Sequence, residues 1–83
     1  MILTGKAKED FIKWNGDKDF EMMLPFEYPT YLNALIIEWF DSIGIWEDLF
    51  YREYRATKFQ DYKRAITQAT IKANKIYNER TKN

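Results

Sequence analysis

The chain contains no cysteine and no histidine, and Ser42 is its only serine. Without cysteine it has no disulfide framework, no thiolate zinc site and no cysteine nucleophile. Without histidine it lacks the usual general base near neutral pH and the commonest protein ligand for zinc. The chain therefore lacks the side chains on which most hydrolase and transferase sites depend. We expect a protein that is not an enzyme and uses neither a cofactor nor a metal.

Long apolar runs are also missing. The first ten residues, MILTGKAKED, hold too short an apolar run for a secretory signal peptide. No uncharged apolar stretch approaches the roughly 20 residues that span a bilayer. We therefore expect a cytoplasmic protein that does not contact membranes.

Aromatic side chains are abundant instead, with six Phe, six Tyr and three Trp among 83 residues. A chain this short buries only about 60–65 % of its unfolded surface, so each core residue must bury a large area. Aromatic rings do so. We expect a single helical domain covering residues 1–83.

Charge is divided unevenly, although the formal net charge is zero. Residues 1–50 carry four lysines against ten acidic residues, a net of −6, whereas residues 51–83 carry nine basic residues against three acidic ones, a net of +6. Such asymmetry indicates a basic element that meets something acidic. The acidic half of the same fold is the simplest partner, and an acidic protein or a nucleic acid is the alternative.

Apolar periodicity predicts a mainly α fold with three main helices, at about 4–15, 30–43 and 60–80. Thr4 is the expected N-cap of the first helix, because its hydroxyl can accept a hydrogen bond from the first turn. The segment 17–30, DKDFEMMLPFEYPT, holds both prolines and should be a loop packed over the core.

The second helix has a clear end signal. Gly44 fits the left-handed position that closes many helices, and Ile45 after it can contact Phe40, as in a Schellman motif. After Gly44 the chain contains neither glycine nor proline. A single long helix would be compatible with that composition, but the apolar pattern argues against it.

Steps of three and four residues run through Phe59, Tyr62, Ile66, Ala69, Ala73 and Ile76. The apolar residues just upstream follow another phase, which predicts a break near 55–58. The connector 45–58 is then either a fourth short helix or an extended segment, and an α+β fold with a small sheet in this connector is the alternative.

The expected core combines one face of each main helix. Its members are Phe11, Trp14, Leu32, Leu35, Ile36, Trp39, Phe40, Ile43, Phe59, Tyr62, Ile66, Ala69, Ala73 and Ile76. The two alanines leave room for large side chains from a neighbouring helix.

Three stretches carry a resemblance: LTGKAKEDFIKW (3–14), WFDSIGI (39–45) and IKANKIYN (71–78). With them the chain resembles a group of short uncharacterised proteins encoded in bacterial and phage genomes. The resemblance implies the order helix, helix, connector, helix. It carries no assigned activity and implies no functional residues.

The last predicted helix bears the strongest candidate for an interaction surface. At about 100° per residue, one line of this helix, opposite the apolar seam, carries Arg64, Gln68, Ile71, Lys75 and Lys82. Asn74 and Asn78 flank it, and such amides can reach base edges when cations hold phosphates. The pI of about 6.2 is unlike the values above about 9 that are typical of nucleic-acid-binding domains.

These observations favour a non-catalytic accessory protein, of phage or mobile-element origin, that acts by binding another protein. A nucleic-acid-binding module that uses the last helix is the first alternative. A self-associating structural component, in which oppositely charged halves of neighbouring copies meet, is the second.

Overall fold

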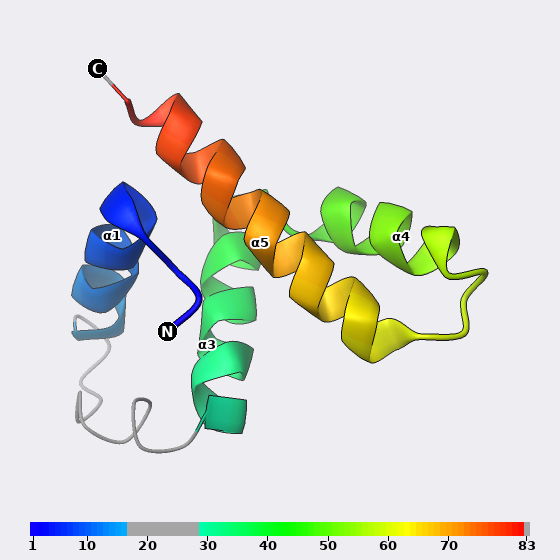
Figure 1. Cartoon of the computed structure of the whole chain (residues 1–83). Coiled ribbons are helices and arrows are strands. Elements are labelled where there is room, and N and C mark those ends of the chain that lie inside the picture. The colour runs from blue at the N-terminus through cyan, green and yellow to red at the C-terminus, as the bar shows by residue number, and fades with distance from the viewer. Residues whose placement is uncertain (17–28, 83) are drawn as a thin grey trace.

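The computed structural model describes residues 1–16 and 29–82, and it contains four helices in those ranges (Figure 1). They are α1 (Gly5–Gly16), α3 (Pro29–Ser42), α4 (Glu47–Ala56) and α5 (Tyr62–Arg80). The mainly helical class is confirmed, and the three predicted helices lie within two residues of their expected bounds. Most of the loop predicted at 17–30 lies outside the described residues, and its last two residues, Pro29 and Thr30, begin α3.

The connector 45–58 forms the helix α4, which makes the three-helix count too low. No strand occurs in the described ranges, so the alternative with a small sheet in the connector is wrong. A helix fits this segment because Leu49 and Glu53 are spaced by four residues and lie half-buried on one side of it.

Helix α5 is the central element (Figure 1). It packs against α4 on one side and against α1 and α3 on the other, and α1 also contacts α3. The molecule measures 38 × 33 × 18 Å. Because helix axes pack about 8–10 Å apart, its smallest dimension corresponds to about two helix layers.

The end of α3 is a Schellman motif, as predicted. The N–H of Ile45 donates to the carbonyl oxygen of Phe40 at 3.0 Å, and the N–H of Gly44 donates to that of Asp41 at 3.1 Å. Gly44 has φ +78°, in the left-handed region that glycine reaches without steric penalty. Ile45 is buried directly after the turn.

The end of α4 repeats this hydrogen-bond pattern without a glycine. The N–H of Phe59 donates to the carbonyl oxygen of Tyr54 at 3.0 Å, and the N–H of Lys58 donates to that of Arg55 at 2.9 Å. Lys58 and Phe59 have φ values of 58° and 61°, so two consecutive side-chain-bearing residues are left-handed. The break predicted near 55–58 is therefore confirmed, since α4 ends at Ala56.

Most of the expected core is confirmed. The buried apolar residues are Leu3, Ala7, Phe11, Leu32, Leu35, Ile36, Trp39, Phe40, Ile45, Trp46, Ala65, Ala69 and Ala73. Trp14, Ile66 and Ile76 were also expected in the core and are partly buried against it.

Three expected core residues are exposed: Ile43 at 41 %, Phe59 at 50 % and Tyr62 at 54 %. Ile43 lies where the chain turns out of α3, and Ile45 is buried in its place. Helix α5 begins only at Tyr62, so Phe59 belongs to the preceding turn. The predicted apolar seam therefore started too early in the chain. It included Phe59 and Tyr62, whereas the part of α5 that packs on the core starts after them.

Candidate interaction surfaces

The two end stretches of the sequence meet through side-chain amides of α5. The Oδ1 atom of Asn78 accepts a hydrogen bond from the N–H of Ala7 at 2.7 Å, and its Nδ2 donates to the carbonyl oxygen of Thr4 at 3.0 Å. Asn74 Oδ1 accepts from the N–H of Thr4 at 2.9 Å, and Asn74 Nδ2 donates to the Thr4 hydroxyl at 3.0 Å. These amides satisfy polar groups at the start of α1, where no intrahelical partner exists.

Gly5 is required at this contact. It has φ +57°, and a Cβ atom added to it would lie 3.3 Å from Nδ2 of Asn78. Thr4 was predicted to cap α1 with its own hydroxyl, but that hydroxyl accepts from Asn74 instead. The first turn of α1 is therefore satisfied by a helix some 70 residues away in sequence.

A second polar contact joins α1 and α5. The hydroxyl of Tyr77 donates to Oδ2 of Asp10, and Lys6 forms an ion pair with the same carboxylate at 3.0 Å. The hydrogen bond from Tyr77 lowers the pKa of Asp10, and Lys6 acts in the same direction. Burial raises the pKa of Tyr77 to about 12, and its hydrogen bond to Asp10 adds to the shift. The Tyr77 ring also lies 4.9 Å from that of Trp39.

These contacts reassign two residues of the predicted surface. Asn74 and Asn78 are half-buried and bound to α1, so the prediction that they can reach the bases of a nucleic acid is wrong. No local pattern distinguishes an amide that faces solvent from one that caps a distant helix, because the partner backbone is remote in sequence.

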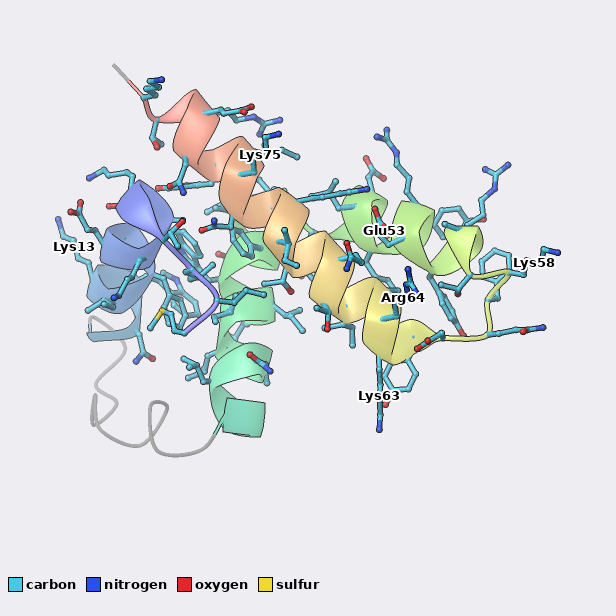
Figure 2. All side chains as sticks on the ribbon, in the orientation of Figure 1. Lys13, Glu53, Lys58, Lys63, Arg64 and Lys75 are labelled. Atoms are coloured by element: carbon cyan, nitrogen blue, oxygen red, sulfur yellow. The ribbon has the colours of Figure 1, made fainter. Side chains whose placement is uncertain are left out.

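The rest of the predicted line is mainly solvent-facing. Arg64, Lys75 and Lys82 are exposed, Ile71 is 46 % exposed, and Gln68 is half-buried. Figure 2 shows Arg64 on the side of α5 toward Glu53 and Lys75 nearer the C-terminal end. Lys82 follows the end of α5, so the helical spacing does not place it. We call these five residues the α5 stripe.

Arg64 and Gln68 also line a groove between α4 and α5 of about 400 Å³. Glu53, on its α4 side, forms an ion pair with Lys72. Asp61, at its end, caps α5 by accepting a hydrogen bond from the N–H of Arg64 at 3.0 Å. Glu53 and Asp61, the two acidic residues of this groove, therefore both stabilise the packing or capping of α5.

Two ion pairs of this structure each join residues of the same half of the chain, so neither pairs the acidic half with the basic half. The pair Lys6–Asp10 lies within the acidic half of the chain, and the pair Glu53–Lys72 lies within the basic half. The cations of the α5 stripe form no ion pair with residues 1–16 or 29–82. They remain accessible to another molecule.

Aromatic rings form a chain along α4 and its turn. Trp46, Phe50 and Tyr54 stack at spacings of four residues, with centroids 5.9 and 5.5 Å apart. Phe59 packs edge-on against Tyr54 at 5.3 Å and contacts Tyr51 at 5.9 Å. Sequence periodicity missed this role of Phe59, because it assigned the ring to the seam of α5.

In the described ranges, no group of three or more acidic, histidine or cysteine side chains could hold a metal ion. None of the helices there combines the length and apolar character needed to cross a bilayer. Comparison with protein families, curated proteins and solved structures finds no match for this chain.

Proposed function

We propose that this chain is a non-catalytic accessory protein that binds another protein through the α5 stripe. The observation that carries this proposal is Ile71, a branched aliphatic side chain 46 % exposed among cations. Protein interfaces place such an apolar group at the centre of a polar rim. The resemblance of the three sequence stretches implies a phage or mobile-element origin.

The electrostatics of the stripe indicate the kind of surface that it fits. Arg64 and Lys75 are exposed on either side of Ile71 in sequence, and neither forms an ion pair within the described residues. A partner with acidic residues around an apolar pocket would complement this arrangement and be steered toward it. The partner that fits the stripe is therefore an acidic protein surface.

Site-specific photo-crosslinking in cells tests this assignment. A photoreactive phenylalanine analogue replaces Ile71 in one variant and Ile43 in a matched control, whose exposed fractions are 46 % and 41 %. We expect a discrete adduct from position 71 that persists after nuclease treatment and is absent from position 43. Equal adducts from both positions, or none from position 71, would refute the proposal.

A second candidate function, nucleic-acid binding, draws on the three exposed cations Arg64, Lys75 and Lys82. Replacing all three with Gln removes the charges and keeps unbranched side chains of high helix propensity. On duplex DNA, each lost phosphate contact would lower the slope of log K against log salt by about 0.9. We expect no such binding by the wild type at about 150 mM salt. At this ionic strength, interactions between exposed charges more than about 8 Å apart are largely screened. Binding that the triple variant abolishes would establish this function instead.

A further inference from the structure

The outer face of α4 has a symmetric charge pattern. Glu47, Tyr51 and Arg55 follow one another at spacings of four residues, and all three are exposed. At about 100° per residue they lie along one side of the helix. Leu49 and Glu53, about half a turn away, are half-buried toward α5.

Within residues 1–16 and 29–82, this face is exposed to solvent. The Tyr51 side chain is 55 % exposed even though its ring contacts Phe59. Glu47 and Arg55 form no ion pair with the described part of the chain. Protein interfaces often have an aromatic side chain at the centre and polar groups at the rim. The ring of Tyr51 between two oppositely charged side chains has this arrangement.

The helix dipole explains part of this pattern, since acids are favoured near a helix N-terminus and cations near its C-terminus. It does not explain the exposed aromatic ring midway between the charges. The order acid, ring, cation is complementary to itself when a second copy runs antiparallel. Glu47 of one copy then lies opposite Arg55 of the other, twice, with the Tyr51 rings at the two-fold axis.

We infer that a second copy of this chain docks on the outer face of α4, forming an antiparallel, two-fold symmetric contact centred on Tyr51. This contact goes beyond the proposed function and uses a different surface, because the α5 stripe lies on another helix. A chain of 83 residues has a small core, and association would add to its stability.

The contact is short, which sets the expected strength. Helix α4 has ten residues and is therefore about 15 Å long. Stable interfaces bury about 1,200–2,000 Å² in total, more than one such helix face supplies. The dimer should consequently be weak and should form progressively as the protein concentration rises into the millimolar range.

Charge exchange tests the pairing directly, with sedimentation equilibrium over a concentration series as the measurement. Glu47→Arg alone leaves only cations at both ends of the face, and Arg55→Glu alone leaves only acids. Each should weaken self-association roughly tenfold or more, because like charges then face each other. The double variant should recover it, and an equimolar mixture of the two single variants should form a heterodimer.

A matched control changes the charge without touching this face. Lys8→Glu, at an exposed position of α1, alters the net charge by the same amount as Arg55→Glu and should leave self-association unchanged. Circular dichroism checks that every variant keeps its helix content, since both exchanges oppose the dipole of α4. Tyr51→Ser, which alters neither charge, supplies a second test and should also weaken the dimer.

Four outcomes would overturn the inference. The first is a wild type that sediments as a monomer up to about 1 mM, a concentration at which even a contact worth about 4 kcal/mol is half-formed. The second is a double variant that is no better associated than the single ones. The third is a dimer that only Lys8→Glu disrupts. Binding of oligo-dT or polyglutamate to the α4 face in place of a second copy would likewise count against it. None of these results bears on adducts formed from position 71, so the two proposals fail separately.

Discussion

Lys58 occupies, at the end of α4, the position that Gly44 occupies at the end of α3. Both residues close a Schellman motif, with φ values of 58° and 78°. The left-handed conformation costs a residue with a Cβ atom roughly 1–2 kcal/mol, whereas glycine adopts it freely. Lys58→Gly should therefore stabilise the fold, and Gly44→Ala should destabilise it.

The structure allows the size of both effects to be worked out. Glycine gives the unfolded chain more freedom, which offsets about 0.5–1 kcal/mol of the relief at Lys58. The net gain for Lys58→Gly is then about 0.5–1 kcal/mol. At Gly44 an added Cβ atom meets nothing within 4 Å, so steric overlap makes no contribution. The loss for Gly44→Ala is thus backbone strain alone, about 1 kcal/mol.

Thermal unfolding followed by far-ultraviolet circular dichroism measures these changes. For a domain of this size, about 1 kcal/mol shifts Tm by roughly 4–8 °C. Lys58→Gly should raise Tm by about 2–8 °C, and Gly44→Ala should lower it by a comparable amount. Micromolar protein concentrations keep self-association out of the measurement.

Lys58→Ala separates strain from charge. It removes the ammonium group but keeps a Cβ atom in the left-handed conformation, so its Tm should stay close to that of the wild type. If Lys58→Ala stabilises the protein as much as Lys58→Gly does, the charge is responsible and the strain argument is wrong. A lower Tm for Lys58→Gly would refute it outright.

Three further predictions concern α5 and its neighbours. Asn78→Ala should lower the free energy of unfolding in urea by about 1–3 kcal/mol, because the N–H of Ala7 loses its acceptor. Asn78→Asp keeps an acceptor near the N-terminus of α1 and should lower it by less. Equal losses in the two variants would contradict the capping role. The pKa of Tyr77 is raised to about 12, so the unfolded chain releases this proton first and stability falls between about pH 10 and 12. Tyr77→Phe should be less stable near pH 8 by about 1–2 kcal/mol and should lose less stability over that alkaline range, and a pH dependence parallel to that of the wild type would exclude this role. Ala69 is fully buried in α5, so Ala69→Leu should lower stability by about 1–3 kcal/mol, whereas Ala34→Leu, at an exposed position of α3, should change it by less than about 0.5 kcal/mol.

Local signals in the sequence were sufficient for α1, α3 and α5 and for one of the two turns, but they left α4 open between a short helix and an extended segment. The end of α3 was predictable because glycine marks the left-handed residue at position 44. Helices α1 and α3 each bury one face, so their periodicity identified core residues such as Phe11 and Ile36. The change of apolar phase also predicted the break before α5.

The tertiary structure decided what depended on distant partners. Lys58 and Phe59 are left-handed without a glycine signal, in a turn where the Phe59 ring packs on Tyr51 and Tyr54 and Asp61 caps the next helix. Helix α5 contacts three other helices, so its buried side is broader than a single seam and starts at Ala65, not at Phe59.

The amides of α5 illustrate the limit of sequence reasoning most directly. In the sequence, Asn74 and Asn78 look like ordinary residues of a solvent-exposed helix face. They become hydrogen-bond partners of Thr4 and Ala7 only because α1 packs against α5. The α5 stripe, by contrast, needed only the helical repeat for Arg64, Ile71 and Lys75, because exposure opposite a buried face follows from local geometry. Helical spacing determines which side chains share a face, whereas a contact between residues 70 positions apart exists only once the chain has folded.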